Sequence, residues 1–205
     1  MPRQIQTAVQ VANLALRTLQ MPEIESFNEE STTAQTVREA YDLVLRRCLG
    51  GYPWSFSQKQ TELERLPMAE LPQWKFSYKL PPDFVELVWL RGGVGDMPGW
   101  CELLHFEIVA GNVVCANAMP PLFCRYQYEA PVALMPHYFL DYLVQALAEE
   151  LAPIFGYNVD GQKILKERAM GKEGKLAAAI LAEERHRSVR REGRWASRLA
   201  MGRNW

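Results

Sequence analysis

The sequence predicts an α+β protein in which an α-helical bundle, built from the N- and C-terminal helices, is interrupted by an inserted small antiparallel β-subdomain. Two N-terminal segments carry apolar residues at three- and four-residue steps, which is typical of amphipathic helices. From residue 54 to 131, short aromatic and β-branched runs alternate with Gly, Pro and Asp, which is typical of strands and turns. Helical periodicity returns at Pro136. Because neither N-terminal helix can bury its apolar stripe alone, we expect the C-terminal helices to complete its core.

The first predicted helix has one apolar stripe, formed by Ile5, Ala8, Val9, Ala12, Leu16 and Leu19. It is expected to end at Met21, because a residue that precedes proline is disfavoured in the helical conformation. A polar loop over 23–33 follows. The stripe needs a partner elsewhere in the chain.

The second predicted helix begins near Thr32 or Thr33, whose hydroxyls can cap the free amides of a first turn. Gly50 and Gly51 are expected to end it, and Pro53 prevents the helix from resuming. Its apolar stripe consists of Ala34, Val37, Ala40, Tyr41, Val44, Leu45 and Cys48. Two amphipathic helices joined by a short loop predict an antiparallel pair.

The β-subdomain is expected to contain strands over 54–60, 74–79, 84–91, 101–107, 113–116 and 123–129. The run from Phe106 to Cys115 resembles a hairpin with its turn at 110–112. The glycine-rich stretch Gly92–Gly99 is interpreted as a loop.

The third predicted helix extends from Pro136 to Leu151, and it is apolar on more than one face, so we expect it at the centre of the bundle. A fourth helix should begin after Asp160 or Gly161 and run past Arg190, with Gly171 and Gly174 as sites for a bend. The predicted segments are therefore 1–53, 54–132, 133–184 and 185–205. One shared core should bury Leu16, Val37, Tyr41, Leu45, Leu143 and Leu147.

Composition narrows the class of protein. A formal net charge of -1 provides no global field for DNA or an acidic membrane. The four cysteines form no C-x-x-C pair, so we expect reduced, buried thiols. Met1–Gln10 lacks the apolar region of a signal peptide, and no apolar run approaches the ~20 residues that span a bilayer. We therefore expect a soluble protein that is made in a cytoplasm.

The sequence offers little that resembles a catalytic or metal site. Gly92–Gly95 lacks the lysine and hydroxyl of a phosphate-binding loop, and no G-x-S-x-G occurs. His105 and Glu107 are too few for a metal site, which needs three or four ligands. Asp83 and Glu86 form a carboxylate pair, but Asp83 is better interpreted as a turn residue after two prolines. We expect no enzymatic activity, no cofactor and no metal.

Arginine and tryptophan are concentrated near the end of the chain. Three interpretations remain open for this segment. It is a solvated helix end that suits the helix dipole, a docking segment rich in hot-spot residues, or a contact for nucleic-acid phosphates. The tryptophans favour docking. The candidate docking residues are Arg185, Arg187, Arg190, Arg191, Arg194, Trp195, Arg198 and Trp205.

The order and spacing of several short segments resemble the tail tubular protein A family of tailed bacteriophages, also called head-to-tail adaptors, connectors or gatekeepers. No single segment is specific, and the similarity covers about Ala8 to Arg194. The similar segments are, in order, Leu19–Ile24, Ala34–Arg47, Trp54–Phe56, Tyr78–Phe84, Pro136–Phe139 and Leu147–Ala152. A long charged helix follows them.

The resemblance implies a structural virion protein at the phage neck or tail, assembled in the host cytoplasm. It implies a dodecameric homo-oligomeric ring below the portal protein, which continues the DNA channel and offers a platform for the tail tube or nozzle protein. Double-stranded DNA would pass without specific binding, and a near-zero net charge agrees with that role. The family contributes no catalytic residues. Another connector or head-completion protein, or a nucleic-acid-binding protein that uses the basic tail, is the alternative.

Overall fold

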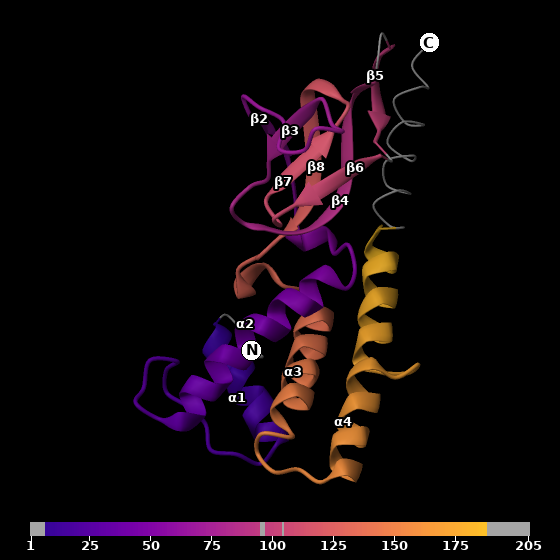
Figure 1. The fold of residues 1–205 in the computed structure, drawn as a ribbon. Coiled ribbons are helices and arrows are strands. Elements are labelled where there is room, and N and C mark those ends of the chain that lie inside the picture. The colour runs from indigo at the N-terminus through magenta and orange to yellow at the C-terminus, as the bar shows by residue number, and fades with distance from the viewer. Residues whose placement is uncertain (1–6, 95–96, 104, 188–205) are drawn as a thin grey trace, which may run out of the picture. The chain divides into compact units, whose positions relative to one another are not determined.

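A computed structural model describes residues 7–94, 97–103 and 105–187 (Figure 1). The chain divides into two compact units. Met1–Cys48 and Pro131–Trp205 form the bundle unit, and Leu49–Ala130 form the sheet unit. The sequence placed these boundaries at 53/54 and 132/133. Helices in one unit and antiparallel strands in the other confirm the α+β class.

Helix α1 (Ala8–Thr18) begins the bundle unit. Thr7 and Gln10 cap it reciprocally, since each side chain accepts a hydrogen bond from the backbone amide of the other residue. The loop after α1 is held by Asn13, whose side-chain amide donates to the Ile24 carbonyl and accepts from the Ile24 amide, both at 2.9 Å. Ile5, the first residue of the predicted stripe, lies outside the described residues.

Helix α2 (Thr32–Gly50) ends at the glycine that the sequence indicated. Its cap is not a threonine. The Ser31 hydroxyl accepts the amide hydrogen bond of Ala34 at 3.1 Å, one residue before the predicted caps. Serine serves this role as well as threonine does, so the hydroxyl pattern alone could not fix the position.

Helix α3 (His137–Leu151) is central to the bundle unit, where it contacts both α1 and α4 (Val159–Met170). Figure 1 shows it between α2 and α4. Residues on several sides of α3 are buried, which explains its broad apolar surface. The predicted shared core is confirmed, because all six of its members are buried in this unit: Leu16, Val37, Tyr41, Leu45, Leu143 and Leu147.

The predicted continuous fourth helix is wrong. Helix α4 ends at Gly171, and a new helix spans residues 175–187. A Cβ atom at Gly171 would collide with the Glu167 carbonyl oxygen, so this turn requires glycine. The two glycines therefore interrupt the helix completely, where the sequence suggested only a bend. The part expected beyond Arg187 lies outside the described residues.

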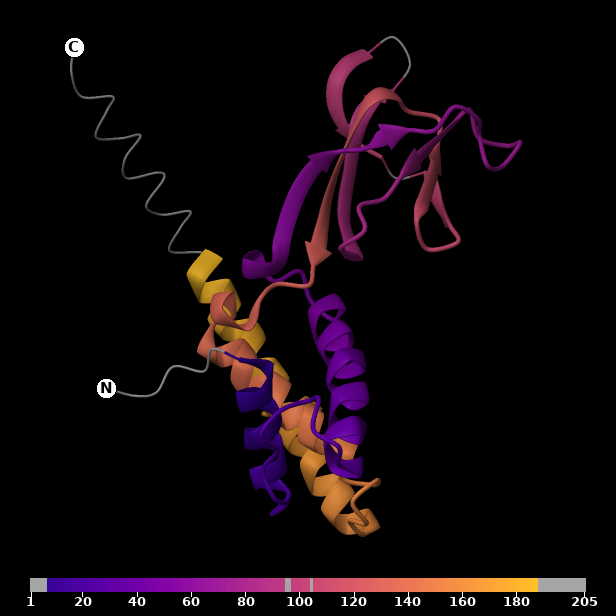
Figure 2. The ribbon, with the colours of Figure 1, turned by 90° about the vertical axis from the view of Figure 1, so that its left-hand side faces the viewer.

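The sheet unit contains two antiparallel sheets, and Figure 2 shows its long strands side by side. The long sheet has the order β1-β8-β4-β5, formed by Gln58–Glu62, Met119–Tyr128, Phe84–Val94 and Met97–Glu102. The short sheet has the order β2-β3-β7-β6, formed by Glu64–Arg65, Phe76–Lys79, Val113–Ala116 and Phe106–Val109. Short 3-10 helices cover Ser55–Ser57 and, in the bundle unit, Val132–Leu134.

A separate hydrophobic core fills the sheet unit. Both sheets contribute to it, with Tyr78 and Val114 from the short sheet and Leu90, Leu122 and Cys124 from the long one. The Tyr78 hydroxyl is satisfied inside this core, since it donates to the Ala118 carbonyl at 2.6 Å. The unit thus has the buried apolar surface of an independent domain.

The predicted hairpin over 106–115 is confirmed as β6 and β7, with Ala110 and Gly111 at positive φ in its turn. One predicted strand and one predicted loop need correction. The expected strand 101–107 is divided at Leu103 into β5 and β6, which belong to different sheets. Gly92 and Gly93 are not in a loop but pair with β8, and a Cβ at Gly92 would lie 3.0 Å from Leu122 Cδ1. This close approach explains a glycine inside a strand.

Strand β1 begins at Gln58, later than the predicted start at residue 54, because Ser55–Ser57 form a 3-10 helix. The remaining predicted strands overlap β3, β4, β7 and β8, with ends that differ by a few residues.

Candidate interaction surface

One aromatic and two cationic side chains form a cluster on the long sheet, which we call the Trp89 cluster: Trp89, Arg91 and Arg125. Trp89 lies directly opposite Arg125 in the β4–β8 register, and Arg91 is two residues further along β4. Pairing and alternation place all three side chains on one face. The guanidinium carbons of Arg91 and Arg125 lie 4.4 and 5.3 Å from the Trp89 ring centre. Two cation–π contacts therefore hold the cluster together.

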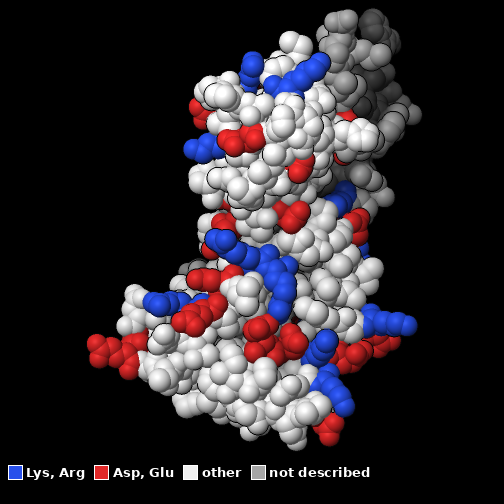
Figure 3. Space-filling view, viewed as in Figure 1, with Lys and Arg blue, Asp and Glu red and all other residues white. Residues whose placement is uncertain are grey.

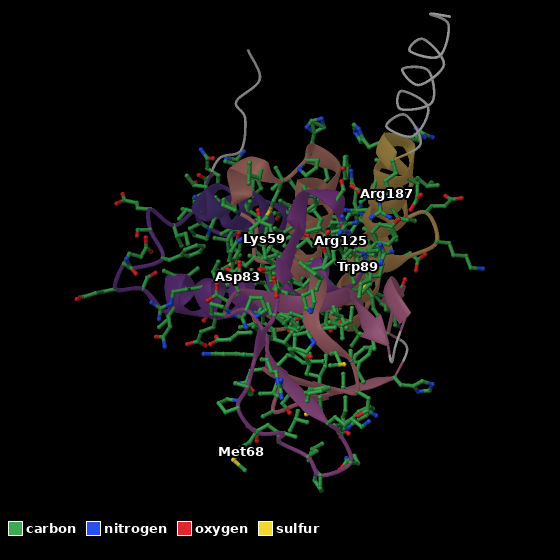
Figure 4. All side chains as sticks on the ribbon, turned by 90° about the horizontal axis from the view of Figure 1, so that it is seen from above. Lys59, Met68, Asp83, Trp89, Arg125 and Arg187 are labelled. Carbon is green, nitrogen blue, oxygen red and sulfur yellow. The ribbon has the colours of Figure 1, made fainter. Side chains whose placement is uncertain are left out.

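The guanidinium groups of the Trp89 cluster can still donate hydrogen bonds to a partner. Arg91 has one distant carboxylate neighbour, Glu102, at 3.9 Å. Arg125 is half-buried and forms no ion pair with any described residue. Figure 4 shows it beside Trp89. A guanidinium in this state can donate to an incoming carboxylate or phosphate, and Trp with Arg is the usual composition of an interface hot spot.

A second polar cluster is centred on Asp83, and its hydrogen bonds are already satisfied. Lys59 Nζ lies 2.6 Å from Asp83 Oδ2, and the Tyr126 hydroxyl donates to Asp83 Oδ1 at 2.9 Å. Lys59 also lies 3.8 Å from the centre of the Tyr128 ring. Burial acts to raise the pKa of Asp83, but the hydrogen bonds from Lys59 and Tyr126 outweigh it, so the pKa lies below its usual value.

Asp83 is therefore more than the predicted turn residue, although the turn is present, with the Phe84 amide donating to the Pro81 carbonyl. Its carboxylate links β1 to β8. Glu86 is exposed and shares no hydrogen bond with Asp83 in the described chain, so these carboxylates do not form a catalytic pair. The same two partners that stabilise the Asp83 charge make it a poor proton acceptor.

His105 and Glu107 are also not brought together as a ligand pair. His105 precedes β6, whereas Glu107 accepts hydrogen bonds from Trp74 Nε1 at 3.1 Å and Gln73 Nε2 at 3.4 Å. Glu107 thus holds the loop between β2 and β3. Across residues 7–94, 97–103 and 105–187, no group of three or more His, Cys, Asp or Glu side chains is placed to hold a metal ion.

Three cysteines are buried and form no disulfide: Cys48, Cys115 and Cys124. Burial raises the pKa of the Cys48 thiol to about 11 and that of Cys124 to about 12. These thiols stay protonated at neutral pH and are weak nucleophiles. The side chain of Cys101 lies outside the described residues.

Only two of the predicted docking residues lie in the described chain. Arg185 is exposed. Arg187 is half-buried, and its Nε lies 3.3 Å from the fully buried carboxylate of Glu183. Glu183 also accepts from the Tyr138 hydroxyl at 2.7 Å, so Arg187 helps to anchor the final helix to α3. The others lie outside the described residues: Arg190, Arg191, Arg194, Trp195, Arg198 and Trp205.

Charges of both signs are interspersed on the face of each unit that Figure 3 displays. The described helices include none that is both long enough and apolar enough to cross a bilayer. Among the large apolar side chains that the structure describes, Met68 in the β2–β3 loop is the most accessible at 81%. The surface therefore favours local contacts over a single long-range field.

No protein-family model matches this chain, and no curated protein matches it in sequence. Function is therefore argued from the residues. The Trp89 cluster was not predicted. Its available signal was the alternation of Trp89 and Arg91 within one strand, but its third member, Arg125, is distant in sequence and meets them only through the β4–β8 pairing.

Proposed function

We propose that this protein is a structural virion component, a head-to-tail adaptor that forms a ring, joins the portal to the tail tube or nozzle, and continues the DNA channel. The observation that carries the proposal is the Trp89 cluster, a preformed hot spot on a rigid sheet. A protein whose task is assembly needs such surfaces more than it needs a reactive cavity. The order of sequence segments resembling the adaptor family supports the same role.

The division into two units also supports a ring. A closed ring of identical subunits needs two different, complementary faces on each subunit. The bundle unit and the sheet unit have separate cores, so each can present its own rigid surface. One subunit can then contact ring neighbours and axial partners through different elements.

The charge distribution agrees with a channel through which DNA moves. Tight phosphate binding requires several unpaired cations in one field, and affinity then falls steeply with salt. Here the net charge is -1 and acidic residues are interspersed with basic ones. DNA could pass such a wall without being held.

Nucleic-acid binding is the second candidate, favoured by the half-buried guanidinium of Arg125, which lies against an indole and has no carboxylate partner in the described chain. Such a pair also suits a phosphate next to a stacked base. This candidate predicts DNA binding that weakens by orders of magnitude as salt increases from 50 to 200 mM, on the scale of roughly 10³–10⁵ for six to ten phosphate contacts.

Electron microscopy of the protein mixed with its cognate portal tests the adaptor. We expect a ring on the portal for the natural sequence and weak or absent decoration for Arg125→Glu. Lys79→Glu makes the same charge change at an exposed position of the short sheet and should still decorate. If no ring forms on the portal and the protein binds DNA in a salt-sensitive way, nucleic-acid binding replaces the adaptor as the proposed function.

A further inference from the structure

A groove lined by both apolar and acidic side chains lies within the sheet unit, between β4 and β6. It has a volume of about 380 Å³. Leu87 and Val88 of β4 line one side, and Phe106 and Ile108 of β6 line the other. Ile108 is 37% exposed although it is a large aliphatic residue. The groove is therefore accessible, and it offers a ligand apolar side chains next to polar groups.

Both walls of the groove are open strand edges. Strand β5 pairs with β4 from Arg91 to Val94, and the Leu103 amide donates to the Leu90 carbonyl. No described strand pairs with residues 84–89 of β4 on the side away from β8. Strand β6 is the last strand of the short sheet. An open edge offers backbone donors and acceptors to an added extended segment.

The groove is acidic at its margin. Glu86 and Glu102 both border it. Glu86 is exposed and has no ion pair within the described chain, and Glu102 is 54% exposed with its only described cation, Arg91, 3.9 Å away. A segment that fits should therefore be extended, carry apolar or aromatic side chains, and bring more than one cation.

One segment of this chain has that chemistry. Residues 188–205 contain five arginines and one glutamate, together with Trp195, Leu199, Met201 and Trp205. We propose that the groove between β4 and β6 binds residues 188–205 of a second copy of this chain. The arginines pair with Glu86 and Glu102, the apolar side chains fill the groove, and the backbone extends one strand edge.

The open edge of β4 and the proposed binding segment have compatible lengths. The open edge of β4 over 84–89 is six residues, or ~20 Å at ~3.3 Å per residue. Residues 188–205 can extend over as much as ~60 Å. The segment thus has enough chain both to leave its own subunit and to occupy a neighbour's groove. An arm from each subunit into the next is a heterologous contact, which closes a ring when the rotation permits.

This inference rests on the proposed ring, because a ring brings a tail and a neighbour's groove together. It differs from the expectation that the tail docks on the portal, since the partner here is another copy of the same chain.

The test uses full-length chains. In the tail variant, Arg194→Glu and Arg198→Glu weaken the chain's own segment as a competitor, because they replace two of its five arginines by acidic residues. The full-length tail variant is then titrated into a fluorescein-labelled peptide of residues 188–205, and the fluorescence anisotropy of the peptide reports binding. We expect saturable binding, and at least about tenfold weaker binding when Glu86→Lys and Glu102→Lys are added to the groove. Glu62→Lys with Glu64→Lys is the charge-matched control on exposed positions of β1 and β2, and it should bind nearly as well as the tail variant.

Failure of the peptide to bind, or equal losses in the groove and control variants, would overturn the inference. A natural chain that excludes the peptide while sedimenting as a monomer would show that the tail occupies its own groove, which overturns the role of the second copy. Micrographs separate the two proposals. If the groove variant still forms rings on the portal but no longer binds the peptide, the proposed arm between neighbours is contradicted and the adaptor proposal stands.

Discussion

The buried amide of Gln127 shows how one side chain organises the entry into the sheet unit. Gln127 is 1% exposed and donates to the carbonyls of Leu49, at 2.6 Å, and Tyr52. It also accepts a hydrogen bond from the buried hydroxyl of Ser57 at 2.6 Å. Three loop and helix-end groups are thus fixed to β8. Polar groups buried in this way are costly when one partner is removed.

We predict that Gln127→Leu lowers the free energy of unfolding of the sheet unit by about 2–4 kcal/mol, because two carbonyls and one hydroxyl each lose a buried hydrogen bond. Gln60→Leu, at an exposed position of β1, should change it by less than about 0.5 kcal/mol. Urea denaturation followed by tryptophan fluorescence measures both. Equal values for the two variants would mean that water replaces Gln127.

Sequence reasoning could not find these residue contacts. Gln127 is one polar residue in a strand, and only the fold shows that the chain from Leu49 to Ser57 lies against it. Asp83 was placed correctly in a turn, but its link to Lys59 and Tyr126 depends on β1 and β4 both pairing with β8. The N-terminal cap of α2 and its end at Gly50 were closer to prediction because they depend on neighbours in sequence.

Among the elements, α3 has the widest set of contacts because it is shared by both ends of the bundle. Its periodicity alone placed it at the centre, since an all-round apolar helix must be covered on all sides. The final helix, 175–187, is attached to it by Tyr138 and by the Lys175–Asp141 pair at 3.1 Å. The interruption at Gly171 was not foreseen, because helix propensity on both sides is high and the close approach of Gly171 to the Glu167 carbonyl is seen only in the structure.

Two leucines of α2 provide a matched test of the shared core. Leu45 is 3% exposed and Leu43 is 60% exposed. We predict that Leu45→Ala lowers the free energy of unfolding of the bundle unit by about 2–5 kcal/mol, whereas Leu43→Ala changes it by less than about 0.5 kcal/mol. Thermal unfolding followed by circular dichroism at 222 nm reports the helices. An unchanged melting temperature for Leu45→Ala would exclude a core shared by α2 and α3.

At the scale of the whole molecule, the two units differ in how the chain builds them. The sheet unit is one continuous segment, Leu49–Ala130, whereas the bundle unit joins two segments that are distant in sequence. Composition and periodicity predicted this plan because helical and strand patterns occupy separate stretches. The pairing order of the strands could not be predicted from the sequence, because five of the six predicted strands have similar lengths and all of these contain aromatic residues.

We predict that the fragment 49–130 folds alone and unfolds cooperatively, because its core is drawn entirely from residues 63–126. The fragment 1–48 should stay unfolded, since α1 and α2 lack the α3 surface that covers them. In NMR spectra we expect dispersed amide resonances for fragment 49–130 and poorly dispersed ones for fragment 1–48. A disordered 49–130 would show that its core depends on the bundle.

The discontinuous bundle also has a consequence during synthesis. Helices α1 and α2 leave the ribosome before α3 exists, and the 82 residues of the sheet unit are translated in between. At ~5–20 residues per second this interval is roughly 4–16 s. Throughout it, the stripes that contain Leu16 and Leu45 remain uncovered, and the sheet unit can close only at its end, because β8 pairs with both β1 and β4. Nascent chains of this protein should therefore depend on chaperones that hold apolar helices, and this need ends when Leu143 and Leu147 emerge.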